Sequence, residues 1–196
     1  MKNSQIKYFA KMLGETFEKD DFYVKFFPKE EQRKKFIYEL FLMRMKIFEK
    51  GCEIFTFEDK GIAFFKRSDF VLKKSAFILH PRIFKMYFWD RELCKKLLNL
   101  IAQADEIEKE CCPAPHYTIS PIGVRNDCKG MGIGKRLMEQ GLSLADKNGM
   151  HCFLETQNKA NIAFYEKFGF ELCKTQYVKD IDLYNYFMVR KPQKND

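Results

Sequence analysis

The stretch that decides the fold is Lys129-Gly130-Met131-Gly132-Ile133-Gly134-Lys135-Arg136. It follows a predicted strand, His116–Val124, and opens a predicted amphipathic helix that runs from about Gly132 to Asn148. Glycine lets a backbone approach a ligand without a Cβ in the way. A helix N-terminus adds unpaired N–H groups and a partial positive charge. The stretch therefore predicts an anion site, most naturally for phosphate.

Two common phosphate motifs do not fit this stretch. A P-loop needs a first glycine where Lys129 stands and a hydroxyl where Arg136 stands. The dinucleotide fingerprint needs its third glycine at Lys135. A nucleoside-triphosphate hydrolase and a dinucleotide enzyme are therefore not expected. A flexible turn that only caps a helix is the structural alternative.

Length and composition favour one globular domain. The chain has 196 residues, of which 46% are hydrophobic, and its 21 phenylalanines indicate a bulky aromatic core or an apolar cleft. The net charge of +8 suits an anionic cofactor or a nucleic acid, although a lysine-rich solvated surface is the favoured explanation for most of it. The sequence holds no long apolar run for a transmembrane helix and no apolar signal core at its start.

The cysteine pattern favours reduced thiols. The seven cysteines are an odd number and include no CxxC pair. Without an export signal, we expect free thiols and a cytoplasmic location. Cys111, Cys112 and His116 lack zinc-site spacing, so no metal site is expected.

Periodicity and breakers predict a mixed α/β fold of the α+β type. Pro121 inside its strand implies an edge or a bulge, because proline cannot donate to the ladder. The order implies a largely antiparallel sheet with one parallel β-α-β unit. The predicted helices are 4–17, 28–50, 91–110 (within a mostly helical 69–110 broken at His80-Pro81), 132–148 and 160–168, and the predicted strands are 52–57, 61–66, 116–124, 151–156, 170–177 and 183–189.

A second stretch makes a family resemblance specific. The chain reads Lys129-x-x-Gly132-x-Gly134, then Asn158, Tyr165, Gly169 and Phe170. It resembles the GNAT superfamily of acyl-CoA-dependent N-acyltransferases, which has R/Q-x-x-G-x-G/A, then an Asn, a Tyr seven residues on, and Gly-Phe. The matching motifs span about residues 116–170, and the N-terminal part agrees only in element order. The resemblance implies a GNAT-like central sheet with a splayed strand pair, flanked by helices.

The resemblance also implies acetyl-CoA (coenzyme A) as the cofactor. Backbone N–H groups of the glycine loop would take its pyrophosphate. The amides of its pantetheine arm would pair with a strand edge exposed near Pro121. Solvated lysines and a helix N-cap at Asn158 are the plain alternatives. The residues expected to bind the cofactor are Ile122, Gly123, Val124, Lys129, Gly130, Met131, Gly132, Ile133, Gly134, Lys135, Asn158 and Asn161.

Acyl transfer to an amine needs a proton acceptor and a proton donor. Tyr165 is the candidate acid, because an ordinary tyrosine is protonated at neutral pH and the matching family residue has that role. A purely structural aromatic is its alternative. The strand before the glycine loop carries no carboxylate, so His116 is the candidate base. A structural hydrogen bond of His116, Glu155 on the next strand and a water relay stay open. A backbone N–H of Ile122 or Gly123 would polarise the carbonyl.

We expect a single domain over residues 1–196, with acceptor-side helices and first strands in 1–110 and an acyl-CoA-binding core in 111–196. The expected reaction is direct attack by the primary amine of a small molecule in a ternary complex. The expected partners include no membrane and no nucleic acid, and the chain is expected to be a monomer or homodimer. Aromatic residues either line the acceptor pocket or pack in the core: Phe22, Tyr23, Phe26, Phe27 and Trp89.

Two rival functions stay open. One is a non-catalytic CoA-binding sensor or interaction module on the same fold, which the missing carboxylate favours and Tyr165 disfavours. The other is a nucleic-acid-binding protein, which only the charge suggests, since the chain shows no basic stripe interleaved with aromatics.

Overall fold

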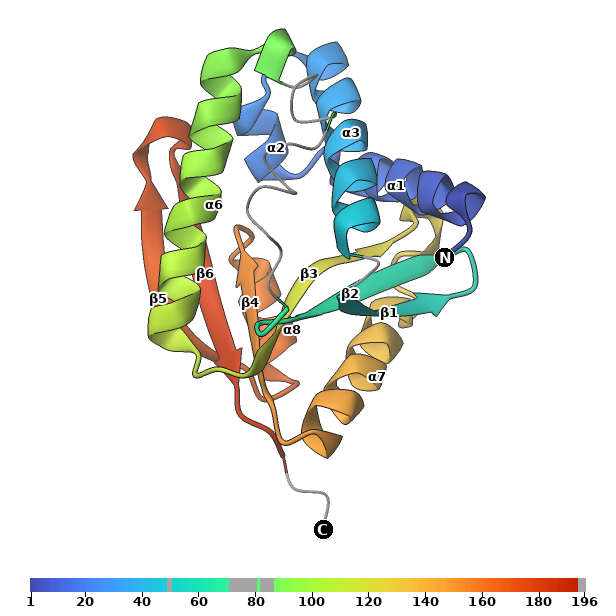
Figure 1. Ribbon diagram of the computed structural model, residues 1–196, viewed down its shortest axis with the longest axis vertical. Coiled ribbons are helices and arrows are strands. Elements are labelled where there is room, and N and C mark those ends of the chain that lie inside the picture. The colour runs from blue at the N-terminus through green and yellow to red at the C-terminus, as the bar shows by residue number, and fades with distance from the viewer. Residues whose placement is uncertain (49–50, 71–80, 82–86, 194–196) are drawn as a thin grey trace.

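The structure is a computed structural model that describes residues 1–48, 51–70, 81 and 87–193. Its centre is a six-stranded sheet of order β1-β2-β3-β4-β6-β5 (Figure 1). Every neighbouring pair is antiparallel except β3 and β4, which are parallel. The expected mixed, largely antiparallel sheet is confirmed. The strands are β1 Cys52–Phe57, β2 Gly61–Arg67, β3 His116–Val124, β4 His151–Thr156, β5 Glu171–Val178 and β6 Leu183–Arg190.

Helices cover both faces of this sheet, as Figure 1 shows. Side chains alternate between the two faces of a strand, so neighbouring residues of β2 join different cores. Ile62 and Phe64 pack with α1, α2 and α3, whereas Ala63 and Phe65 pack with α7. The helices are α1 Asn3–Phe17, α2 Asp21–Phe26, α3 Glu30–Phe48, α6 Arg91–Cys111, α7 Ile133–Lys147 and α8 Ala160–Glu166, with short 3-10 turns η1 Asn126–Cys128 and η2 Lys179–Ile181.

Strands β3 and β4 stop pairing soon after they begin and then diverge. They pair only over His116–Thr118, which lie opposite residues 151–153. Further along, β3 stays with β2 and β4 stays with β6. The β2–β3 register shifts between Ile119 and Ile122, on either side of Pro121. The expected splayed pair and bulge are therefore confirmed, but β3 is an internal strand and only its second half has an open edge.

Helix α2 is an element that the sequence analysis did not predict. Its N-cap is Asp20, whose carboxylate accepts from the Phe22 N–H at 3.0 Å. The helix has only six residues, too few to show helical periodicity. The predicted helix over 28–50 is observed as α3, and residues 49–50 lie outside the described residues. The predicted break at His80-Pro81 also lies outside them, apart from Pro81 itself.

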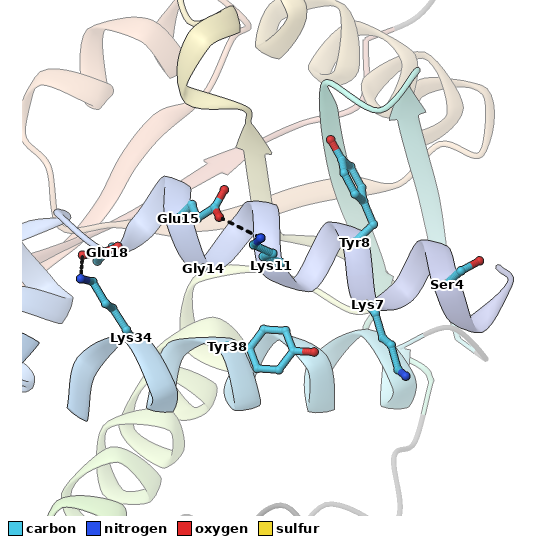
Figure 2. Close-up of a pocket in the computed structure, with 9 residues that line it drawn as sticks. All are labelled: Ser4, Lys7, Tyr8, Lys11, Gly14, Glu15, Glu18, Lys34 and Tyr38. Carbon is cyan, nitrogen blue, oxygen red and sulfur yellow. Dashed lines mark ion pairs between the residues drawn. The ribbon is translucent and has the colours of Figure 1, made fainter. Parts of the chain in front are cut away.

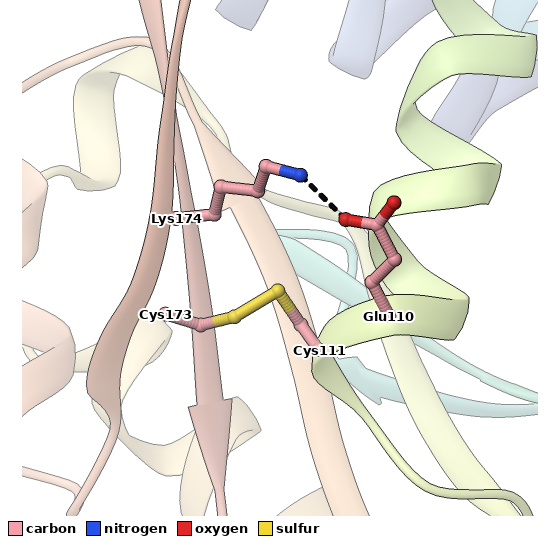
Figure 3. Close-up of a disulfide and its surroundings, with 4 residues drawn as sticks. All are labelled: Glu110, Cys111, Cys173 and Lys174. Carbon is pink, nitrogen blue, oxygen red and sulfur yellow. Dashed lines mark hydrogen bonds and ion pairs between the residues drawn. A yellow bond between two sulfur atoms is a disulfide. The ribbon is translucent and has the colours of Figure 1, made fainter.

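One pair of cysteines is oxidised, which corrects the expectation of reduced thiols. Cys111, the last residue of α6, is joined to Cys173 in β5 by a 1.98 Å S–S bond (Figure 3). Cys52, Cys94, Cys112, Cys128 and Cys152 are free. The bonded pair is 62 residues apart in sequence, so only the fold brings the two together. The Lys174–Glu110 ion pair at 2.5 Å lies beside the disulfide.

A close approach between α7 and β2 gives a stability prediction. A Cβ placed on Gly141 would lie 2.1 Å from the ring of Phe65, which is fully buried. Gly141→Ala should therefore lower the free energy of unfolding by about 1–3 kcal/mol through overpacking, less about 1 kcal/mol of helix propensity. Denaturant unfolding measures this change. Ser143→Ala, at an exposed position of the same helix, is the control and should cause no loss. Equal stability of Gly141→Ala and the parent would contradict this packing.

Candidate active site

The glycine loop forms a left-handed turn at the start of α7. Gly130 has φ +82° and Gly132, the N-cap of α7, has φ +74°. Residues with a Cβ seldom adopt these angles, so glycine is required at both positions for its backbone conformation. A Cβ on either residue would meet nothing within 4 Å. Open space therefore lies in front of both glycines.

Consecutive backbone N–H groups face this open space. In the described chain, no hydrogen bond is formed by the N–H groups of Gly130, Gly132, Ile133, Gly134 and Lys135. The first bonded N–H of the helix is that of Arg136, which donates to the Gly132 carbonyl at 3.1 Å. Unpaired N–H groups and the helix dipole favour a negative charge at this end. The loop is therefore built as an anion cradle and fits a diphosphate.

The cations around the loop are partly engaged by the chain itself. Lys135 Nζ lies 3.6 Å from Oε1 of Glu139, which is one helical turn further along. The Arg136 guanidinium lies over the Phe57 ring, with 5.3 Å to the centroid. Lys129 is exposed. These side chains raise the local positive potential, while the backbone supplies the directed donors.

The open edge of β3 begins next to the loop. Ile122, Gly123 and Val124 pair with β2 on one side, and β4 has moved away on the other. Alternate backbone groups of a strand point to opposite sides, so part of this stretch presents N–H and C=O groups to the opening. A Cβ on Gly123 would come within 2.4 Å of Leu13. Glycine is thus required there because α1 packs against the strand.

Two asparagines lie where β4 leads into α8, and both amides are used locally. Asn158 Oδ1 accepts from the Ala160 N–H at 2.9 Å, in the turn that precedes α8, whose N-cap is Lys159. Asn161 Nδ2 donates to the Thr156 hydroxyl at 3.2 Å. The Asn158 side chain is exposed, and its Nδ2 donor stays available. This contact within the turn and a contact with a cofactor are therefore compatible.

Tyr165 has a buried ring on the α7 side of the sheet. Its ring packs edge-on against Phe164 and Phe170, and the residue is 8% exposed. Burial raises the pKa of its hydroxyl to about 12, so the group keeps its proton at neutral pH. The Tyr165 hydroxyl forms no hydrogen bond with the described residues. Every fully buried side-chain oxygen of those residues does have a hydrogen-bond partner, so this hydroxyl is not fully buried. The hydroxyl therefore reaches solvent, as a proton donor must.

His116 is held in a buried ion pair rather than in an open site. The residue is 3% exposed, and Nε2 donates to Glu108 Oε1 at 2.8 Å while Nδ1 donates to the Pro113 carbonyl at 3.1 Å. Burial by itself favours the neutral ring, but the contacts with Cys112 and Glu108 outweigh it and raise the pKa of His116 to about 9. Both ring nitrogens thus carry protons at neutral pH. This arrangement argues against the expected role of His116 as a base.

Glu108 completes this ion pair from helix α6. Its carboxylate also accepts a hydrogen bond from Thr118 Oγ1. Burial raises the pKa of Glu108, but the hydrogen bonds from His116 and Thr118 and the charge of Lys66 bring it below its usual value. The pair joins α6 to the first residues of β3. Its position indicates a structural role.

Glu155 is the carboxylate at the strand opening. It lies two residues beyond Phe153, where the β3–β4 pairing ends. Its side chain is solvent-accessible and forms no hydrogen bond or ion pair with the described residues. The surrounding protein nevertheless raises its pKa by removing bulk water, against the pull of Arg44 and Lys66. An accessible carboxylate with a raised pKa is a stronger base than an ordinary glutamate.

The sequence analysis gave Glu155 only as an alternative to His116. Both are polar residues on adjacent strands, and periodicity does not say which one is buried. The useful signal was the position of Glu155 near the end of β4, because functional side chains gather where parallel strands end. His116 stands at the start of β3 instead.

The N-terminal aromatics divide between core and surface. Tyr23, Phe26 and Phe27 are buried in the cluster with α1 and α3, and Phe22 packs against it. Trp89 is 40% exposed. Core packing thus accounts for the first four residues.

Two surface hollows lie away from the glycine loop and the strand opening. The larger, about 680 Å³, runs between α1 and α3 (Figure 2) and is lined by Ser4, Lys7, Tyr8, Lys11, Gly14, Glu15, Glu18, Lys34 and Tyr38. The other, about 660 Å³, lies between β1 and α7. Neither contains a residue of the glycine loop or the opening. The candidate site is therefore an open strand edge with a loop, not one of these hollows.

The part of the chain that the structure describes contains neither a metal-binding cluster nor a membrane-spanning helix. There, no group of three or more His, Cys, Asp or Glu side chains is placed to hold a metal ion. No helix in the same residues is long and apolar enough to cross a membrane.

Comparison with known proteins gives a consistent family match. Residues 88–170 match the acetyltransferase (GNAT) family. The chain is 29% identical over 84 residues to N-alpha-acetyltransferase 50 of Danio rerio, which covers 37% of this chain and 50% of that protein. It is 31% identical over 65 residues to the 5-NmdU N-acetyltransferase of Pseudomonas phage PaMx11, covering 33% of this chain and 46% of that protein. The chain spans about half the length of these curated relatives.

The fold is also similar to that of a solved structure. The crystal structure described as histone acetyltransferase HPA2 and related acetyltransferase, from Corynebacterium glutamicum, superposes with a TM-score of 0.69. The match covers 100% of this chain and 95% of that one at 15% identity. At this identity the likeness concerns the fold alone.

The His116–Glu108 pair predicts a pH-dependent stability. The raised pKa of His116 means that its stabilisation is complete below pH 6.5 and is lost as pH rises through about 9. We expect the free energy of unfolding to fall by about 3 kcal/mol over that range on account of this residue. His116→Gln should flatten the decline, which denaturant unfolding at a series of pH values measures. The control is His151→Gln, at the paired position on β4. The same decline in parent and His116→Gln would contradict the assignment.

Proposed function

We propose, from the premise that the chain belongs to the acetyltransferase (GNAT) family, that it transfers an acetyl group from acetyl-CoA to a primary amine. The observation that carries the proposal is the set of unbonded N–H groups of Gly130 and Gly132–Lys135 beside the open edge of β3. This set suits the diphosphate of coenzyme A, and the strand edge suits the amides of its pantetheine arm. Lys129, Met131, Ile133 and Gly134 belong to this cradle in the proposal.

The described residues supply the proton transfers that such a reaction needs. Bound acetyl-CoA supplies a thioester carbonyl for attack by an amine and a thiolate that leaves. Glu155 accepts the proton that the attacking amine loses. Tyr165 gives its proton to the leaving thiolate, and a backbone N–H of Ile122 or Gly123 donates to the carbonyl oxygen. The products are an amide and coenzyme A.

Glu155 takes the role of base in this proposal in place of His116. Its carboxylate is accessible and has no partner among the described residues, whereas His116 is buried in an ion pair. Glu155 also lies at the opening, while His116 lies at the closed end where β3 and β4 are paired. A base that meets a substrate must be at the open end.

We propose a small-molecule amine as the acceptor, attacked in a ternary complex. The relatives named above act, by their names, on a protein N-terminus and on a modified nucleotide, so relatives alone do not select the class. A non-catalytic CoA sensor is the second candidate, and the accessible Glu155 disfavours it.

We propose a cytoplasmic location, where the thiol pool would keep the Cys111–Cys173 pair partly reduced.

The cofactor cradle is tested by Gly132→Glu. A carboxylate at the mouth of the cradle should repel the diphosphate and abolish acetyl-CoA binding in calorimetry. Gly149→Glu is a matched control, because Gly149 also has positive φ (+61°), has open space at its Cβ and follows the other end of α7. Both variants carry the same backbone strain of about 1 kcal/mol. Retained affinity in Gly132→Glu would refute the cradle, and equal loss in both would point to misfolding.

The proton-transfer roles are tested by Glu155→Gln and Tyr165→Phe. Each variant should lower turnover about 100-fold or more while acetyl-CoA affinity stays nearly unchanged, because each group acts in proton transfer only. Thiol release over a range of pH measures this, and Glu155→Gln should also lose the acidic limb of the kcat/KM profile. Glu171→Gln, an exposed carboxylate at the start of β5, is the control. Full turnover in either variant would remove that residue from the mechanism.

A further inference from the structure

Two basic side chains stand at the strand opening, where their charges act on Glu155 without a direct ion pair. Arg44 projects from α3, and Lys66 is in β2. Both are half-buried, and neither forms an ion pair within the described part of the chain. Arg125 and Arg190, by contrast, are paired with the carboxylates of Asp59 and Asp146, and the buried Arg33 donates to backbone carbonyls. A half-buried cation without an anion is costly unless a ligand supplies one.

The Arg44 guanidinium is held in place by two contacts with the protein. Its Nη2 donates to Ser120 Oγ at 2.8 Å, and its guanidinium lies over the Phe48 ring at 5.6 Å from the centroid. A guanidinium has five N–H donors, and only one is used here. The remaining donors form a rigid fork that matches a carboxylate or phosphate.

Strand register places these groups around the opening on one face of the sheet. Lys66 lies opposite Thr118, which in turn lies opposite Phe153. Side chains two residues apart share a face, so Ser120 and Glu155, each two residues further on, point to that same face. Because β3 and β4 have parted by then, Ser120 with its bound Arg44 stands on one side of the opening and Glu155 on the other.

We propose that Arg44, assisted by Lys66, binds an anionic group of the acceptor, so that the preferred acceptor is an amine that also carries a carboxylate or phosphate. The inference rests on the proposed acetyl transfer and deepens it. The amine lies at the Glu155 carboxylate and the anion at the Arg44 guanidinium, across the opening. Charge complementarity is satisfied at both ends of such a substrate.

The same arrangement selects against purely cationic acceptors. A polyamine or an aminoglycoside would bring further positive charge to Arg44 and Lys66 without pairing them. An anionic amine pairs these cations and leaves Glu155 for proton transfer. Specificity then comes from attraction between these cations and the anion of the acceptor, and from repulsion of purely cationic amines.

The test compares amines that differ only in the anion, using the full chain, acetyl-CoA and thiol release. The pairs are phenylalanine with phenethylamine, and O-phosphoethanolamine with ethanolamine. Arg44→Met should lower the kcat/KM ratio of anionic to non-anionic amine on the order of 10- to 100-fold. Arg44→Lys should keep part of the preference, and Lys66→Met should reduce it. Lys46→Met, an exposed lysine further along α3, should keep the full ratio.

The outcomes separate this inference from the proposed function. An unchanged ratio in Arg44→Met, with transfer intact, overturns the anion site and leaves acetyl transfer standing. A preference confined to O-phosphoethanolamine supports the site and identifies phosphate as its anion. If acetyl-CoA binds and no amine is acetylated, the proposed function fails. Calorimetry of phenylalanine and O-phosphoethanolamine with the CoA-loaded chain then decides the site alone. Binding that Arg44→Met removes supports it, and no binding of either overturns it.

Discussion

The parting of β3 from β4 is the constraint on which the rest of the structure depends. A sheet with complete pairing would use the backbone groups of both strands on each other. Here the parallel pair ends after Thr118, and Pro121 then removes one donor from the strand. Leu13 of α1 packs where Gly123 has no side chain, which fixes the parted strand against its helix. Glu155 and the Ile122–Val124 edge lie at this opening, and the glycine loop lies beside it.

The opening joins two faces of the sheet that differ in character. On the α7 face lie the glycine loop and the largely buried Tyr165, set among apolar side chains. On the opposite face lie Arg44, Lys66 and Glu155, whose charges act on one another without a direct ion pair among the described residues. In our proposal the donor enters from the first face and the acceptor from the second. The charged face alone then selects the acceptor.

Much of the framework follows from local sequence rules. The glycine alternation before an amphipathic stretch led to the anion cradle, and Pro121 led to the bulge, because glycine and proline act on the backbone where they stand. Helix α2 was not predicted, because six residues are too few to show helical periodicity of apolar side chains. The Cys111–Cys173 bond escaped it because its two residues meet only when α6 lies along β5.

The sequence by itself predicted the order of the strands and of the longer helices, the glycine loop at the start of α7 and Tyr165 as the candidate proton donor. These depend on neighbouring residues and on motif spacing. The tertiary structure alone decided that His116 is a buried cation and Glu155 an accessible carboxylate. It also decided that Arg44, from a distant helix, faces the same opening. Protonation and charge pairing depend on burial and on partners remote in sequence, and those exist only once the chain has folded.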